Sequence, residues 1–151
     1  MSEMKINLEE ARIAFEAAAT EHSQEFELFF LSKLYGLSYS YTDKTCEITF
    51  EPKGFSFNPQ GSLHGGVITT IMDISMGHLL KKNQGAGVTL EIKVQFIKSI
   101  KNGKCKCIGK ILKMGRSVAF MASELFDQDG ELCAVASSTW KIIENKTGDS
   151  K

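Results

Sequence analysis

The chain has 151 residues, 42% hydrophobic and 24% charged, which is enough for one domain with a buried core. Basic and acidic residues number 18 each, so no net field attracts nucleic acid or an anionic membrane. No apolar run reaches the roughly 18 residues of a membrane span, and residues 1–5 lack a signal-peptide pattern. We therefore expect a soluble cytoplasmic protein with no nucleic acid or membrane partner.

The first part of the chain has helical character. Asn7 precedes a leucine and two glutamates, the pattern of a helix N-cap with Glu10 at the third helical position. A second helix is expected over residues 23–34, and Gly36, two residues further on, is expected to stop it. Residues 1–35 are therefore predicted to form an N-terminal helical extension.

Strand patterns dominate the rest. Residues 45–50 alternate apolar and polar side chains with period two. Four more strand candidates follow the central helix, at residues 88–98, 105–114, 117–127 and 132–143. Their connections are short and contain turn residues, at 102–103, 114–115 and 127–130.

One helix with strands before it and an antiparallel meander after it indicates an α+β domain, in which the sheet wraps the helix. We expect this domain to span residues 36–144, and residues 145–151 to form a flexible tail.

The segment that leads into the central helix carries the strongest chemical signal. An irregular loop containing Asn58 ends in His64, Gly65 and Gly66, and the apolar residues 67–80 follow with helical spacing. The first N–H groups of a helix lack intrahelical partners and can hold an anion or a developing oxyanion. Glycine at that point lets a carbonyl group approach closely. Taken alone, His64 and Asn58 also fit ordinary turn residues.

Asp73 is the one carboxylate in this apolar run. An ionised carboxylate inside an apolar helix costs several kcal/mol unless it is paired or hydrogen-bonded. No basic residue lies three or four positions away. Asp73 is therefore expected either to meet a polar partner from another element or to border a cavity, which makes it a candidate functional group.

The spacing between Asp73 and the glycine turn bears on assembly. Gly66 and Asp73 are seven residues apart, about 10 Å along a helix axis. Groups that catalyse one acyl transfer must lie within roughly 3 Å of the reacting atoms. If both serve one reaction, two antiparallel copies of the helix must each supply one group, as in a two-fold dimer.

The cysteines carry little functional signal. Cys105 and Cys107 share one face of a strand-like stretch, and no second Cys or His pair at metal-ligand spacing accompanies them. We expect reduced structural thiols and no metal site.

Several motifs together resemble a known family. They are Asn58, the His64–Gly66 turn, Asp73 nine residues after the histidine, and the segments 87–91 and 113–116. With these motifs the chain resembles the hotdog-fold acyl-CoA thioesterases of the PaaI and acyl-CoA thioesterase 13 group, from about residue 36 to residue 143. The resemblance implies an antiparallel sheet wrapped around a central helix, no metal or redox cofactor, and a dimer with a continuous sheet, paired again into a tetramer.

The resemblance also implies a role for each matching residue. Asp73 matches the catalytic acid, which acts as general base or nucleophile. Gly65 matches the residue whose backbone N–H polarises the thioester carbonyl, with His64 and Asn58 ordering the loop and the carbonyl or water. Thr89 falls where relatives place a Ser or Thr that positions water or substrate. Further expected substrate contacts are Gly66, Lys113, Met114, Gly115, Arg116 and Ser117.

Three functions remain open. The first is hydrolysis of an acyl- or aryl-CoA to the free acid and CoA. The second is an acyl-CoA hydratase or dehydratase, which needs a His and an acid aimed at the α and β carbons, and the spacing of His64 and Asp73 fits that poorly. The third is a non-catalytic hotdog protein that binds acyl-CoA, against which the intact Asp73 argues. Sequence does not determine the acyl group.

Overall fold

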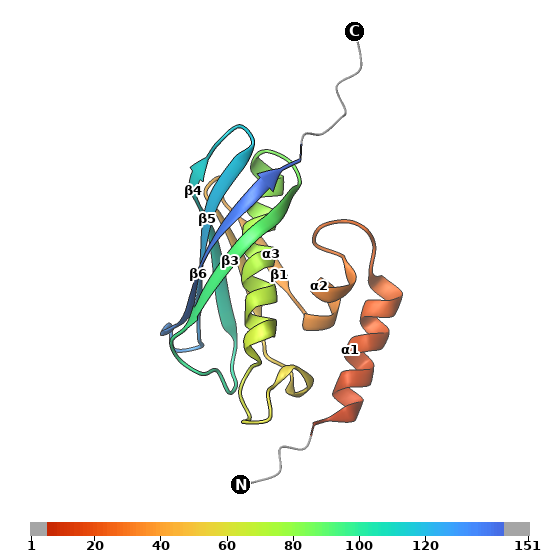
Figure 1. Ribbon diagram of the computed structural model, residues 1–151. Helices are drawn as coiled ribbons and strands as arrows, with labels where there is room; N and C mark the ends of the chain where they lie inside the picture. The colour runs from red at the N-terminus through yellow and green to blue at the C-terminus, as the bar shows by residue number, and fades with distance from the viewer. Residues whose placement is uncertain (1–5, 144–151) are drawn as a thin grey trace.

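The computed structural model describes residues 6–143, so the expected tail at residues 145–151 lies outside the described residues. A six-stranded antiparallel sheet curves around one long helix (Figure 1). The strands lie in the order β1-β2-β4-β5-β6-β3. Their bounds are β1 Ser38–Tyr41, β2 Thr45–Phe50, β3 Gly87–Phe96, β4 Cys105–Met114, β5 Val118–Phe126 and β6 Leu132–Ile142. The predicted α+β hotdog architecture is confirmed.

The central helix, α3 (Gly65–Asn83), forms the middle of the core. It is apolar on most of its circumference, and every residue from 74 to 80 is buried. Fully buried side chains of the helix include Ile71, Met72, Met76, Leu79 and Leu80. Each such side chain contributes about 1.5–3 kcal/mol by leaving water. None of the helices within residues 6–143 is long and apolar enough to span a membrane.

The predicted strands are confirmed to within two residues at each end, but the predicted meander is wrong for β3. Strands β4, β5 and β6 are consecutive neighbours, whereas β3 pairs with β6 at the far edge and β4 pairs with β2. The Asn102–Gly103 turn is present, with Gly103 at φ 84°, yet it does not join two paired strands. A turn fixes only the local chain direction, while the pairing partner depends on how the sheet closes around α3.

The N-terminal segment contains two helices on the side of α3 that faces away from the sheet (Figure 1). The first, α1 (Leu8–Glu21), begins as predicted, because the Asn7 side chain accepts a hydrogen bond from the Glu10 N–H at 3.1 Å. The second, α2 (Phe30–Tyr35), is much shorter than the predicted helix over residues 23–34.

Backbone hydrogen bonds explain the short α2. The Ser23 N–H bonds the Leu28 carbonyl, and the Leu28 N–H bonds the Glu25 carbonyl, so this stretch is a turn instead of a helix. Gly36 ends α2 as predicted, in a left-handed conformation with φ 65°. The turn residue Phe26 presents its carbonyl to His78 Nε2 on α3 at 2.6 Å, which ties the N-terminal segment to the central helix.

Candidate active site

His64 defines the start of α3. It is the N-cap residue, and its Nδ1 atom accepts a hydrogen bond from the Gly66 N–H at 2.8 Å. An accepting Nδ1 carries no proton, so the neutral ring holds its proton on Nε2. The next two N–H groups, of Val67 and Ile68, bond the His64 carbonyl. The ring and the carbonyl of His64 therefore bind three successive N–H groups of the first helical turn.

Gly65 is the first helical residue and carries the free donor. Within residues 6–143 no hydrogen bond uses its N–H, in contrast to the Gly66 N–H, which the His64 ring occupies. A free N–H at the positive end of a helix dipole can bind an anion or an oxyanion. Of the two predicted glycines, the geometry thus offers the Gly65 amide to a ligand.

Asn58 organises the loop before the helix. Its Oδ1 accepts hydrogen bonds from the N–H groups of Gln60 and Ser62, at 3.0 and 3.1 Å. Its Nδ2 donates to Ser62 Oγ at 3.0 Å. These three bonds hold the Asn58 side chain within its own loop.

Asp73 meets one polar partner from another element. The Thr89 hydroxyl donates to Asp73 Oδ1 at 2.7 Å. The register of β3 against β6 shifts between Thr89 and Glu91, which leaves Leu90 as a bulge beside this contact. Asp73 takes part in none of the ion pairs found within residues 6–143. The carboxylate is therefore oriented by a hydroxyl and not neutralised by a cation.

The environment of Asp73 changes the pKa of its carboxyl group. Burial raises the pKa of the Asp73 carboxyl above its ordinary value of 3.8, and the hydrogen bond from Thr89 opposes that shift. A carboxylate with a raised pKa is a stronger base than one in water. The group thus has the properties required to accept a proton from water.

One protomer does not bring Asp73 and Gly65 together. They are eight residues apart on the straight helix α3, which is about 12 Å along its axis. A single reacting carbonyl cannot contact both groups of the same helix. The separation predicted from sequence therefore persists in the structure.

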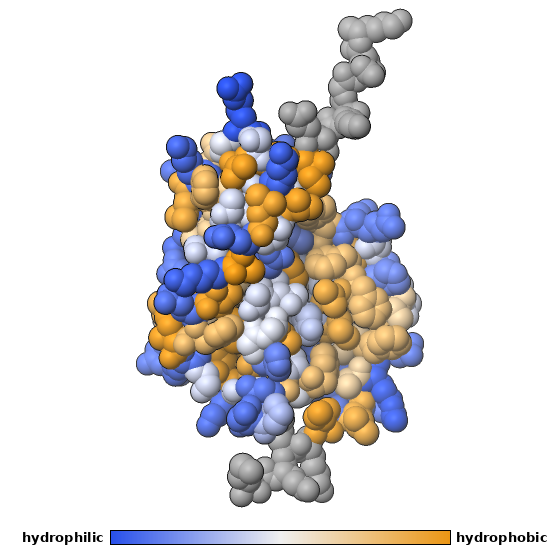
Figure 2. Space-filling model, viewed as in Figure 1, coloured by the Kyte–Doolittle hydropathy of each residue, from blue (hydrophilic) through white to orange (hydrophobic). Residues whose placement is uncertain are grey.

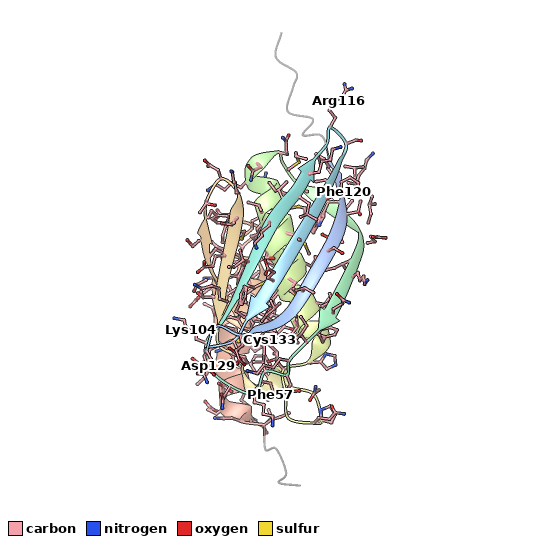
Figure 3. The ribbon with its side chains drawn as sticks, turned by 90° about the vertical axis from the view of Figure 1, so that its left-hand side faces the viewer. Phe57, Lys104, Arg116, Phe120, Asp129 and Cys133 are labelled. Carbon is pink, nitrogen blue, oxygen red and sulfur yellow. The ribbon has the colours of Figure 1, made fainter. Side chains whose placement is uncertain are left out.

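The turn at residues 113–117 lies at the other end of the sheet from Gly65. It joins β4 to β5, and the Gly115 N–H bonds the Val118 carbonyl at 2.9 Å. Figure 3 shows Arg116 at the tip of this turn, at the end of the molecule opposite Lys104 and Phe57. Lys113, Met114 and Ser117 flank the tip, and neither Lys113 nor Arg116 forms an ion pair with another residue in 6–143.

A pocket of about 320 Å³ opens beside Gly65. Its lining includes Asn58 and Gly65, together with Phe96 and Ile97, which were not expected site residues. Phe96 is the last residue of β3, and the alternation Ile92, Val94, Phe96 would have indicated that it faces the helix. A larger hollow of about 490 Å³ on the outer face of the sheet contains none of the expected residues.

Comparison with known proteins gives the family. The model of the thioesterase superfamily matches residues 60–134, about half of the chain. The chain belongs to the thioesterase superfamily. The matched range holds Gly65, Asp73, Thr89 and the turn at residues 113–117, while Asn58 lies just before it.

Two curated relatives and one solved structure illustrate the similarity to this superfamily. A candidate esterase of Saccharolobus solfataricus is 35% identical over 88 residues, 57% of this chain and 63% of the relative, somewhat less than two thirds of its length. The 1,4-dihydroxy-2-naphthoyl-CoA hydrolase of Escherichia coli is 29% identical over 104 residues, 67% of this chain and 76% of that enzyme. A Bacillus halodurans protein solved with CoA superposes with a TM-score of 0.78, at 17% identity over 92% of each chain.

Part of α3 in this superfamily member stays uncovered. Residues 81–83 are exposed at the C-terminal end of the helix. In its first half, the residues that retain exposure include Gly66, Thr69, Thr70 and Asp73. Their spacing of three and four residues places them along one side of the helix. Figure 2 shows this strip as pale surface over α3, between orange apolar surface over β3 and over α1. The candidate carboxylate therefore lies on an open, weakly polar strip flanked by apolar surface.

Proposed function

We propose that the protein is an acyl-CoA thioesterase, which hydrolyses the thioester of an acyl- or aryl-CoA to the free acid and CoA. Membership of the thioesterase superfamily supports this reaction class. The observation that carries the proposal is the Asp73 carboxyl, which the Thr89 hydroxyl holds and which forms no ion pair with any residue in 6–143. The free Gly65 amide supplies the second requirement, a donor for the oxyanion.

The proposed site needs two protomers. A two-fold axis that makes two copies of α3 antiparallel places Asp73 of each copy against Gly65 of the other. The uncovered strip around Thr69 and Thr70, midway between these residues, leaves room for the second helix. Strand β3 supports the same arrangement, because it is an edge strand with exposed Val88 and Leu90. A further pairing of dimers into a tetramer belongs to the same proposal.

The reaction then has a simple course. The thioester carbonyl oxygen accepts a hydrogen bond from the Gly65 N–H of one protomer. Asp73 of the other protomer, as general base, removes a proton from a water molecule, whose oxygen attacks the carbonyl carbon. The tetrahedral intermediate collapses, the carbon–sulfur bond breaks, and the CoA sulfur leaves with a proton. In the alternative course an Asp73 carboxylate oxygen attacks the carbonyl carbon, the carbon–sulfur bond breaks and the CoA thiolate leaves with a proton from solvent. Water then hydrolyses the mixed anhydride, which releases the free acid and restores Asp73.

Two observations support an acyl-CoA as the substrate: the compounds that similar proteins bind or hydrolyse, and the positive charges at the β4–β5 turn. The Escherichia coli relative acts on an aryl-CoA, and solved structures of similar fold contain CoA or acetyl-CoA. Lys113 and Arg116 form no ion pair with any residue in 6–143, so these cations are proposed to bind CoA phosphates. We also propose the cytoplasm as the compartment, which the four free, buried cysteines favour.

A mixed-dimer experiment tests both the chemistry and the two-protomer site. Asp73→Asn removes the base. Gly65→Pro removes the free N–H at the first helical position, where proline is common, although its β-carbon requires the exposed Phe96 ring to shift by a few tenths of an ångström. The extended backbone of His64, with ψ 133°, suits a residue before proline. Each variant alone should release free thiol from acyl-CoA at least about a hundredfold more slowly than the unchanged protein.

Mixing the two variants distinguishes the possible sites. After co-refolding in equal amounts, half of the dimers are mixed, and each mixed dimer has one site with both groups intact, which restores about a quarter of full activity. No recovery contradicts the shared site. Acyl-CoA binding without thiol release by the unchanged protein indicates a binding protein, and hydration of an enoyl-CoA without thiol release indicates a hydratase.

A further inference from the structure

The ring of Phe96 lies directly against Gly65. A β-carbon placed on Gly65 would lie 3.2 Å from Phe96 Cζ and 3.4 Å from Cε1, which is tighter than ordinary van der Waals contact. The ring therefore covers one face of the backbone at the residue whose N–H is free. A ligand bound to that N–H must pass beside the Phe96 ring.

The strand register explains why this aromatic ring faces the helix. Phe96 pairs with Ala134 of β6, and Val94 pairs with Ala136, and both alanines are buried under α3. Phe96 therefore continues the inward-facing row of β3. It nevertheless keeps 56% of its surface exposed, because β3 ends there at the edge of the sheet. A large apolar side chain on the inner face, but outside the core, is free to contact a ligand.

The pocket beside Gly65 is a candidate binding site for that ligand. Its apolar walls come from Leu63, Ile68, Phe96 and Ile97, and its rim carries polar groups, including Ser62 and Ser99. A mostly apolar cavity with a few polar groups next to a hydrogen-bond donor is the usual form of a small-molecule site.

The direction of the substrate follows from the two ends of the protomer. In one protomer the start of α3, which is Gly65, lies at the end opposite the β4–β5 turn that carries Arg116 (Figures 1 and 3). An antiparallel partner brings its own turn toward this Gly65. The CoA arm then reaches Gly65 from the partner's side. The pocket next to Gly65, on its own protomer, is left for the acyl group.

We infer that Phe96 is a specificity-determining residue, whose ring forms the wall of an acyl pocket beside Gly65 and limits the size of the acyl group. The inference rests on the proposed thioesterase function. In a hydrophobic pocket one methylene group changes the relative kcat/KM of two substrates about 10- to 200-fold, so a wall of this size strongly affects the choice of substrate. Removing the ring enlarges the pocket, and a larger ring shrinks it.

The test compares acyl groups within each variant. For the unchanged protein, Phe96→Ala and Phe96→Trp, kcat/KM is measured with hexanoyl-CoA and dodecanoyl-CoA by release of free thiol. Phe96→Ala should raise the dodecanoyl-to-hexanoyl ratio about tenfold, and Phe96→Trp should lower it. A purely structural role would not move the ratio in opposite directions. Phe96→Leu, which keeps an apolar side chain, serves if the alanine variant does not fold.

Phe120→Ala is the matched control. Phe120 is 46% exposed and lies on β5 opposite Lys113, and the β4–β5 and β5–β6 pairings place it on the outer face of the sheet. Figure 3 shows it near the Arg116 end of the molecule. Its replacement can alter the rate with both substrates, because they share the CoA moiety, but should leave their ratio unchanged.

The outcomes separate this inference from the proposed function. Suppose that the unchanged protein releases thiol, but that the dodecanoyl-to-hexanoyl ratio of both Phe96 variants stays within about twofold of its ratio. That result overturns the inference and leaves the thioesterase proposal intact. A Phe120→Ala shift equal to that of Phe96→Ala also overturns it. If the unchanged protein releases no thiol, the function fails, and the same ratio is then read from dissociation constants of the two acyl-CoAs.

Discussion

Thr89 and Asp73 join the edge strand to the central helix through one hydrogen bond of 2.7 Å. Phe96, at the other end of the same strand, contacts Gly65 at the start of that helix. The two ends of β3 therefore each support one of the two candidate catalytic groups. An antiparallel partner strand would bring the Thr89 end of one copy toward the Phe96 end of the other. The same two-fold axis would therefore place Thr89 and Asp73 of one copy close to Phe96 and Gly65 of the other.

Replacement of Asp73 by Asn should abolish activity and raise stability. The folded-state pKa of Asp73 lies above its ordinary 3.8, so ionisation destabilises the folded protein progressively as the pH rises from 3.8 through the folded-state pKa. Asn removes that penalty and can still accept the Thr89 hydrogen bond. We expect at least about a hundredfold slower thiol release together with a higher melting temperature at pH 7.

The exposed Asp129, on the β5–β6 loop, provides the control for this prediction. Asp129→Asn should change neither the activity nor the melting temperature appreciably. The stability difference between Asp73→Asn and the unchanged protein should narrow as the pH falls toward 3.8. A lower melting temperature for Asp73→Asn at pH 7 would contradict the assignment of Asp73 as a strained, functional carboxylate.

Replacement of Thr89 by Val should move the pH dependence of the reaction. The Thr89 hydroxyl stabilises the ionised carboxylate and so lowers the pKa of Asp73 against the effect of burial. Without it, the acid limb of kcat/KM should shift to higher pH, and kcat should fall about tenfold. Thr89→Ser keeps the hydroxyl and should retain the original acid limb. The profile of kcat/KM is measured between pH 4 and 9. If the acid limb of Thr89→Val stays where it is in the unchanged protein, the Thr89 hydroxyl does not influence the group that takes up the proton.

Loss of the cations at the β4–β5 turn should weaken substrate binding. Lys113→Ala and Arg116→Ala should each raise KM for acyl-CoA about tenfold with little change in kcat, because a charge-assisted phosphate contact is lost. The difference should shrink at high salt, where exposed charges are screened. Lys104→Ala is the control, since Lys104 lies at the other end of the sheet (Figure 3). Equal effects at Lys104 and Arg116 would indicate a general charge effect instead of a phosphate site.

His78 should make the protein less stable in mild acid. Burial lowers the pKa of His78 below its ordinary 6.5, although its hydrogen bond to the Phe26 carbonyl and nearby Glu27 partly oppose the shift. The folded protein therefore binds this proton more weakly than the unfolded chain, and stability is lost as the pH falls below 6.5. In His78→Phe the fall in melting temperature between pH 7 and pH 5 should be smaller. His22→Phe, at the exposed end of α1, should follow the unchanged protein.

Local sequence patterns predicted the elements well where one residue type determines the outcome. Asn7 predicted the start of α1 through its cap, and the alternation of residues 45–50 predicted β2. They failed where the outcome depends on distant contacts. The helix over residues 23–34 is replaced by a turn and a short helix, since Phe26 contacts His78 far along the chain. The partner of β3 was also mispredicted, because sheet closure and not the turn after it decides the pairing.

For the candidate site, the sequence alone determined which chemical groups are present. A carboxylate in an apolar helix, a histidine before two glycines and a cation-bearing turn are visible in the order of residues, because helix periodicity and desolvation cost are local properties. Only the tertiary structure decided that Thr89 holds Asp73, that His64 occupies the Gly66 N–H and leaves that of Gly65 free, and that Phe96 covers Gly65. These relationships depend on the packing of an edge strand against a helix, which residues distant in sequence determine together.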